Sequence, residues 1–305
     1  MAFVTGSDGV ELYVEATGSG EPILFIHEFA GDHRSWEPQV RWFSRRYRCI
    51  TYCARGYPPS DVPADVTSYS QAQAVEDARS VLDGMSIDRA HVIGNSMGAF
   101  CGLHLALRHP DRTRSVVVAA CGYGTHPDAR ESFRREAEAV ASALEHEDMA
   151  AVASRYAVGP ARVQLQNKDP RGWAEFAEQL AEHSPVGAAL TMRGVQRERP
   201  SLYDLGAELE RMTVPMLLIV GDEDEGALDA SLMLKRTVPS AGLAVLPRTG
   251  HTANLEEPSQ FNQLVGDFLS RAEHDRWDRR DPRSLAGGTT GIEPISAPGS
   301  TTSTS

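Results

Sequence analysis

The stretch Ala90-His91-Val92-Ile93-Gly94-Asn95-Ser96-Met97-Gly98 decides how this chain folds. Its first four residues suit a buried strand, and Ala99–Leu107 after it has helical character. The pattern predicts a strand, a sharp turn and a helix, with Ser96 at the apex. Such a turn strains the serine backbone, so the residues two before and two after it must be small. Gly94 and Gly98 meet that need, which makes Ser96 a candidate nucleophile.

The composition is that of a globular protein with a sizeable core. The chain has 305 residues, of which 41% are hydrophobic, and its net charge is −12. A nucleic-acid surface requires clustered lysine and arginine, which the sequence lacks, so we expect no nucleic-acid partner. The acidity is more simply explained as a contribution to solubility.

Targeting and metal signals are missing from the sequence. No apolar run is long enough to span a bilayer, and the N-terminus does not resemble a secretory signal, so we expect a cytoplasmic protein without a membrane partner. The four cysteines lie in or beside apolar segments without metal-ligand spacing: Cys49, Cys53, Cys101 and Cys121. We expect buried free thiols, no metal and no cofactor.

Apolar strands alternate with amphipathic helices along most of the chain. The expected strands are Glu11–Ala16, Pro22–Ile26, Cys49–Cys53, Ala90–Ile93, Ser115–Ala120, Pro215–Val220 and Leu243–Leu246. The expected helices are Trp36–Arg46, Tyr69–Met85, Met97–Arg108, Leu228–Thr237 and Pro258–Arg271. This alternation predicts an α/β fold with a mostly parallel sheet and helices on both faces. Ligands of such folds bind at the carboxyl ends of the strands.

Two segments break the alternation. Residues 122–212 contain helical stretches without strands, interrupted by prolines, and are expected to be a helical insertion in a core made of residues 1–121 and 213–272. Residues 273–305 are first charged and then rich in Gly, Ser, Thr and Pro. They cannot bury enough apolar area to fold, so we expect a disordered tail.

A nucleophilic serine needs a base to take its proton and an acid to hold that base. The candidate base is His251, which follows the last expected strand and so lies at the carboxyl edge of the sheet. The acid is expected after a strand between the serine and the histidine. The segment Gly221-Asp222-Glu223-Asp224-Glu225 follows such a strand and offers Asp224 as first choice and Asp222 as second.

An acyl-transfer reaction also needs two fixed donors for the developing oxyanion. The turn supplies the N–H of Met97, and the loop His27-Glu28-Phe29-Ala30-Gly31 offers the N–H of Phe29. We interpret His27 as a structural histidine bonded to the loop backbone rather than as a second base.

Taken together, these motifs make the chain resemble the α/β-hydrolase family with a helical lid, from about Phe3 to Arg271. The matching pieces are the loop at 27–31, the turn at 94–98, Gly221-x-x-Asp224, and Gly250-His251 leading to Glu257-Pro258. The Gly-x-x-Asp pattern of the family is what favours Asp224 over Asp222. The resemblance implies that the insertion is the lid over the active site.

The chain departs from the family pattern in two loops. Glu28 stands where the family usually has glycine, and Cys53-Ala54-Arg55-Gly56-Tyr57-Pro58-Pro59-Ser60 replaces the usual Asp-x-Arg-Gly-x-Gly-x-Ser. Glu28 either repels anionic substrates or pairs with an arginine such as Arg55, and we favour the pairing.

The resemblance implies a serine hydrolase that cleaves a small-molecule carboxylic ester or lactone, similar to esterases and enol-lactonases. Alternatives are a carbon–carbon bond hydrolase acting on ring-cleavage products, whose turn Gly94–Gly98 resembles, and a cofactor-free haloperoxidase. Carbon–carbon hydrolases typically place tryptophan after the catalytic histidine, where this chain has Thr252. A ligand receptor without activity is a further hypothesis, which the complete set of Ser96, Asp224 and His251 disfavours.

Overall fold

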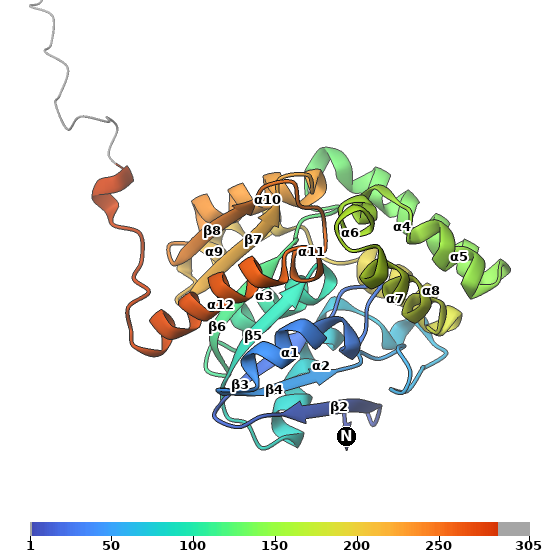
Figure 1. Ribbon diagram of the computed structural model, residues 1–305, viewed down its shortest axis with the longest axis horizontal. Helices are drawn as coiled ribbons and strands as arrows, with labels where there is room; N and C mark the ends of the chain where they lie inside the picture. Colours follow the sequence, from blue (N-terminus) through green and yellow to red (C-terminus); the bar gives the residue numbers. More distant parts are fainter. Residues whose placement is uncertain (1, 286–305) are drawn as a thin grey trace, which may run out of the picture.

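The apolar stretches form the strands of one mixed sheet in the computed structural model, which describes residues 2–285 (Figure 1). The strand order is β1-β2-β4-β3-β5-β6-β7-β8. β1 and β2 pair antiparallel, β2 is antiparallel to β4, and the other neighbours are parallel. The strands are β1 Ala2–Thr5, β2 Glu11–Thr17, β3 Glu21–Ile26, β4 Tyr47–Tyr52, β5 Ala90–Asn95, β6 Thr113–Ala119, β7 Met216–Gly221 and β8 Ala241–Leu246.

Both faces of the sheet are covered, which explains why its central strands are apolar throughout. In β3, Leu24 and Ile26 join one apolar cluster while Ile23 and Phe25 join another on the opposite face. The first face packs against α2 (Gln71–Gly84), α3 (Met97–Arg108) and α10 (Glu225–Thr237). The second packs against α1 (Glu37–Phe43) and α12 (Pro258–Glu273). The predicted α/β architecture is therefore confirmed.

The strands and helices expected from the sequence all appear, with ends shifted by a few residues. β1 was not predicted, because it is a four-residue edge strand in which only Val4 is buried. α10 starts three residues earlier than expected, immediately after Asp224. The expected helix at Trp36–Arg46 begins instead as a 3₁₀ turn, His33–Trp36, before α1.

The chain between β6 and β7 forms only helices, and we call residues 122–212 the helical insertion (Figure 1). Its α-helices are α4 Arg130–His146, α5 Met149–Tyr156, α6 Val163–Lys168, α7 Pro170–Ala181, α8 Pro185–Thr191 and α9 Gly206–Arg211. Pro170 and Pro185 begin helices rather than only ending them. At that position the missing N–H of proline costs nothing, since the first N–H groups of a helix have no intrahelical partner.

The insertion packs on the loops that follow the strands. A third apolar cluster joins insertion residues such as Leu144, Phe176 and Leu180 to Phe29 and Met97 of the core. This cluster places the insertion over the carboxyl ends of the strands, where ligands of such folds bind.

The structure also bears on the cysteines, on membrane-spanning helices and on metal-binding groups. The four cysteines are all buried, and within residues 2–285 none of them forms a disulfide. In the same part of the chain, no helix combines the length and apolarity that crossing a membrane requires. Nor do three or more His, Cys, Asp or Glu side chains among these residues gather into a group that could hold a metal ion.

The packed chain continues beyond the expected boundary at Ala272. The ring of Trp277 lies edge-on to Phe268 of α12, with centroids 4.6 Å apart, and its Nε1–H donates to the carbonyl of Ser240 at 2.7 Å. The tail expected from Glu273 onward is therefore ordered in its first part, because one aromatic residue in a polar segment finds an apolar partner. Residues 286–305 of that expected tail lie outside the described residues.

Replacing Trp277 with alanine should lower the melting temperature measurably. The substitution removes a half-buried ring and one hydrogen bond, which together contribute about 2 kcal/mol. For a domain of this size we expect a fall of about 5 °C in a thermal unfolding scan. Arg279→Ala, two residues away and exposed, is the matched control and should change it by less than about 1 °C. Equal melting temperatures for the two variants would show that the Trp277 contact contributes nothing.

Candidate active site

The turn between β5 and α3 holds Ser96 in a backbone conformation that serine rarely adopts. Ser96 has φ 51° and ψ −113°, and it precedes the first residue of α3. It is partly exposed, whereas the residues on both sides of it are buried. A positive φ at a non-glycine residue costs free energy and persists only when the surroundings impose it. The geometry lifts this hydroxyl out of the sheet, as the sequence predicts.

Close backbone contacts explain why the two glycines of the turn are required. A Cβ on Gly94 would lie 2.2 Å from the carbonyl oxygen of Gly98, and a Cβ on Gly98 would lie 2.0 Å from that of Ile26. Neither contact leaves room for a side chain. The second one also shows that the end of β3, and with it the loop to Phe29, packs directly against the serine turn.

Asp224 and His251 meet at the ends of β7 and β8. The Nδ1 of His251 lies 2.9 Å from Oδ2 of Asp224, and both side chains are buried. A Cβ on Gly221 would lie 2.0 Å from the carbonyl oxygen of Thr249, so this glycine lets the two loops approach. Asp222, the second choice from the sequence, is exposed and accepts from the N–H of Thr249 instead.

The bond to Asp224 fixes the state of the His251 ring. A carboxylate only accepts, so Nδ1 carries the proton and Nε2 carries the lone pair that a general base needs. Burial by itself lowers the pKa of His251, but the charge of Asp224 and its hydrogen bond outweigh burial and hold the pKa above the usual 6.5. The edge of the Tyr123 ring adds an apolar wall, 5.1 Å from the imidazole between centroids.

A buried carboxylate that the sequence did not single out supports the histidine loop. Glu256 accepts from the N–H of Gly250 at 2.6 Å and from the N–H of Thr252 at 2.9 Å. Thr252 is the N-cap of the short helix α11, Ala253–Glu256, and Glu256 at the end of that helix reaches back to the backbone before it. The glutamate follows the threonine by four residues, one more than the capping-box spacing, so no standard sequence motif pointed to this contact.

The loop after β3 presents the second candidate oxyanion donor. The Nε2 of His27 accepts from the N–H of Ala54 at 3.0 Å, so Nδ1 is the donor and bonds the carbonyl of Glu28 at 2.6 Å. This carbonyl and the N–H of Phe29 belong to one trans peptide and point in opposite directions. His27 therefore orients the Phe29 N–H, and burial, which lowers its pKa to about 4, keeps it neutral. The structural role expected for His27 is confirmed.

The hydroxyl of Tyr57 fixes the next peptide of this loop by donating to the carbonyl of Phe29 at 2.9 Å. Tyr57 belongs to the segment in which the chain departs from the family pattern. No local pattern predicts this contact, because the two residues belong to loops after different strands.

Glu28 pairs with an arginine, but not with the one suggested by the sequence. Its two oxygens accept from Nη1 and Nη2 of Arg162, at 2.8 and 2.5 Å, and both side chains are buried. Arg55 instead binds Asp77 at 2.6 Å and Asp8 at 2.8 Å. The expectation failed because Arg162 belongs to the helical insertion, whose path cannot be derived from local sequence patterns.

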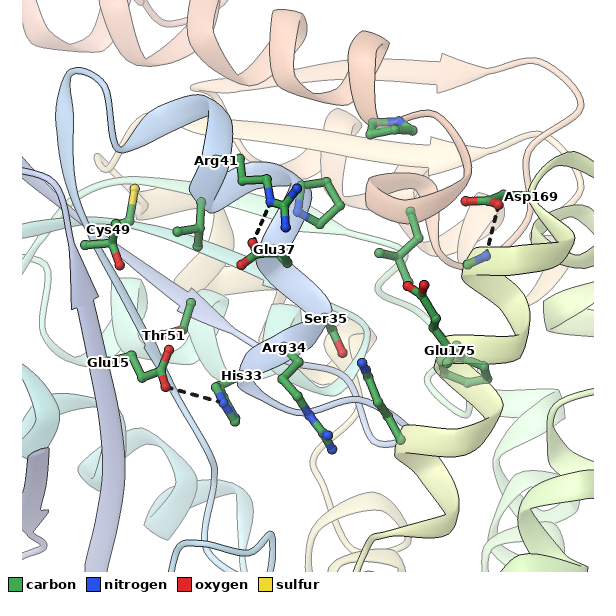
Figure 2. A pocket seen from close by; sticks show the side chains of 18 of the residues that line it. Glu15, His33, Arg34, Ser35, Glu37, Arg41, Cys49, Thr51, Asp169 and Glu175 are labelled. Atoms are coloured by element: carbon green, nitrogen blue, oxygen red, sulfur yellow. Dashed lines mark hydrogen bonds and ion pairs between the residues drawn. The ribbon is translucent and has the colours of Figure 1, made fainter. Parts of the chain in front are cut away.

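A groove of about 740 Å³ lies where α7 of the insertion faces α1 of the core (Figure 2). Figure 2 shows charged side chains around it, including Arg34, Arg41 and Glu175. Neither Ser96 nor His251 lines this groove. We do not assign it to the reaction.

Comparison with known proteins identifies the family of this chain. The family model for the alpha/beta hydrolase fold matches residues 21–258, which include the serine turn and the Asp224–His251 pair. The chain belongs to the α/β-hydrolase family.

The relatives of this α/β-hydrolase carry different names. It is 30% identical to a putative carbamate hydrolase from Stutzerimonas stutzeri, over 85% of this chain and 97% of the relative. It is 26% identical to the 2-hydroxymuconate semialdehyde hydrolase of a Pseudomonas species, over 87% and 93%. The crystal structure of an enol-lactonase from Burkholderia xenovorans superposes with a TM-score of 0.75 at 25% identity, covering 88% of this chain and all of that one.

Replacing Asp222 and Asp224 with asparagine, one at a time, tests which of them holds His251. Asp224→Asn leaves the imidazole without the acceptor that fixes its tautomer, so we expect a loss of about 10⁴-fold in kcat, as in serine proteases. Asp222→Asn is the matched control two residues away, and it should lose less than about threefold because its carboxylate is exposed. Steady-state rates on p-nitrophenyl butyrate measure both. A reversed order would assign the role to Asp222.

Proposed function

We propose that this α/β-hydrolase cleaves carboxylic esters or lactones through an acyl-serine intermediate. Ser96 is the nucleophile, His251 the general base and Asp224 its orienting acid, with the N–H groups of Phe29 and Met97 as oxyanion donors. The observation that carries the proposal is the buried His251–Asp224 bond, whose histidine is linked to the strained serine turn by the Asn95 side chain, which donates to the carbonyl of His251 at 3.3 Å. A base held in one tautomer near a serine hydroxyl is the arrangement that serine acyl transfer requires.

The reaction follows from these roles in two halves. His251 takes the proton of Ser96 as the hydroxyl attacks the carbonyl carbon, and the negative oxygen forms against the two N–H groups. The protonated His251, stabilised by Asp224, then gives the proton to the leaving alcohol. In the second half His251 activates a water molecule, which attacks the acyl-serine and releases the acid and free Ser96.

The helical insertion acts as the lid in this proposal. Its residues share an apolar cluster with Phe29 and Met97, the two residues assigned to the oxyanion site. A substrate whose carbonyl reaches Ser96 must therefore lie between the sheet and the insertion. This supports a small-molecule substrate with an apolar acyl part, because ligand sites of this kind are mostly apolar with a few fixed polar groups.

Hydrolysis of a carbon–carbon bond in ring-cleavage products is the second candidate. The turn Gly94-Asn95-Ser96-Met97-Gly98 and the similarity to a 2-hydroxymuconate semialdehyde hydrolase favour it. Thr252, in the place where such enzymes typically have tryptophan, disfavours it. Parallel assays with p-nitrophenyl esters, a lactone panel and a ring-cleavage dienoate separate the two functions. An esterase or lactonase should turn over the esters or lactones faster than the dienoate, whereas a carbon–carbon hydrolase should turn over the dienoate faster.

Ser96→Ala should abolish turnover of p-nitrophenyl acetate and butyrate while leaving the fold intact. Loss of the nucleophile removes the acyl-enzyme route and should lower kcat by about 10⁴-fold or more. The circular dichroism spectrum and melting temperature should match those of the wild type, since the hydroxyl makes no cap bond to α3. Near-normal turnover by the purified variant would exclude the acyl-serine mechanism.

The pH profile tests the state of His251. The base must be neutral to accept a proton, so kcat/KM should rise with pH and reach half its maximum above pH 6.5, because the pKa of His251 is raised. In Asp224→Asn the charge that raises this pKa is gone, so the midpoint of the residual activity should move to lower pH. A midpoint unchanged by this substitution would show that Asp224 does not act on the titrating base.

A further inference from the structure

The ion pair between Glu28 and Arg162 is buried beside the loop that carries the proposed oxyanion donor Phe29. Glu28 stands between His27 and Phe29, and its carboxylate is held by both Nη atoms of Arg162. The guanidinium lies 4.8 Å from the ring centroid of Phe176 and 5.5 Å from that of Tyr156. The Tyr156 ring is in turn 5.9 Å from the ring of Phe29, whose N–H is the proposed oxyanion donor.

The pair is also close to the catalytic base. A Cβ on Gly250, the neighbour of His251, would lie 3.6 Å from the carbonyl oxygen of Ala161, the neighbour of Arg162. The charges of Arg162 and Glu28 act on the pKa of His251 in opposite directions, Arg162 lowering it and Glu28 raising it. The two charges therefore oppose each other at the His251 ring, and the effect of Arg162 is the larger.

An arginine fork of this kind is the usual means by which a protein holds a carboxylate. Two parallel N–H donors match the two oxygens in geometry and charge, and aromatic faces beside the guanidinium strengthen the attraction. In this chain the two Nη donors of Arg162 are occupied by the carboxylate of Glu28. The Nε of Arg162, which is buried, has no hydrogen-bond partner within residues 2–285, so the arginine is not fully satisfied by Glu28.

We propose that Glu28 masks Arg162, so that the site accepts esters and lactones with a neutral acyl part and rejects those that carry a free carboxylate there. The proposal rests on the ester or lactone hydrolysis proposed above and names the substrate class of that same site. An incoming carboxylate meets the carboxylate of Glu28, while both Nη donors of Arg162 are already occupied by it. Removing Glu28 should convert the site into one that binds a carboxylate.

Two matched esters test the mask. In mono-p-nitrophenyl adipate a carboxylate replaces the terminal methyl group of p-nitrophenyl hexanoate, and the leaving group is the same. We expect the wild type to favour the hexanoate by about 100-fold or more in kcat/KM, mainly through KM. In Glu28→Gly the preference should shrink at least about tenfold, because the adipate carboxylate takes the place of Glu28 on Arg162. The double variant Glu28→Gly/Arg162→Met should restore it, since the fork is then absent.

A second measurement does not depend on turnover. Glu28→Gly leaves the Arg162 cation buried without its partner, so its melting temperature should fall, and sodium acetate should raise it again by several degrees relative to sodium chloride of equal ionic strength. Acetate should not have this effect on the wild type or on the double variant. If Glu28→Gly does not fold, Glu28→Ala vacates the same place beside Arg162 without the added backbone freedom of glycine and replaces it in both assays.

The outcomes separate the mask from the reaction. A wild type that hydrolyses the adipate half-ester as well as the hexanoate overturns the mask while leaving ester hydrolysis intact. Acetate that stabilises all variants equally, or none, also overturns it. The proposed reaction fails if the wild type turns over neither ester, or if Ser96→Ala does not abolish the turnover. In that case the acetate measurement still decides whether Glu28 covers an arginine that binds carboxylates.

Discussion

The contact between the serine turn and the end of β3 is the constraint on which the whole site depends. Gly98 lies so close to the carbonyl of Ile26 that no side chain fits between them. This approach places the start of α3 against the loop that carries Phe29, so the proposed nucleophile Ser96 and the two proposed oxyanion donors are positioned by one backbone contact. The strain at Ser96 is the cost of that approach, and the packing of β5 between β3 and β6 supports it.

The residues around Ser96, Asp224 and His251 could be found from the sequence because each belongs to a local pattern at a strand end. Parallel strands deliver their carboxyl ends to one edge, so three short motifs in the right order were enough to predict a common site. The choice between Asp222 and Asp224 needed the family pattern, since both leave the same strand. In the structure Asp224 is buried against His251, whereas Asp222 is exposed.

Contacts made by the insertion could not be predicted in the same way. Arg162 meets Glu28 across 134 residues of chain, and no periodicity encodes such a pairing. The insertion also reaches the core through Arg34–Glu182 and Lys168–Glu257, which are more exposed and so contribute about 1 kcal/mol or less each. The buried Glu28–Arg162 pair differs in kind, since removing one partner of such a pair costs about 3–5 kcal/mol. Trp277 is the one residue of the expected tail that the sequence marks as able to dock, but a single aromatic residue in a polar segment does not show where it packs.

The hydrogen bonds of Glu256 have a consequence for how such a protein diverges. They close the segment from Gly250 to Glu256 on itself, and Asn95 of the serine turn ties it to the sheet through the carbonyl of His251. The proposed general base thus owes much of its position to its own loop and to the strands, while the insertion touches this region through residues such as Tyr123 and Lys168. Mutations elsewhere in the insertion can therefore reshape what the protein recognises without moving the histidine, so that new specificities can evolve while the proton-transfer groups are inherited unchanged.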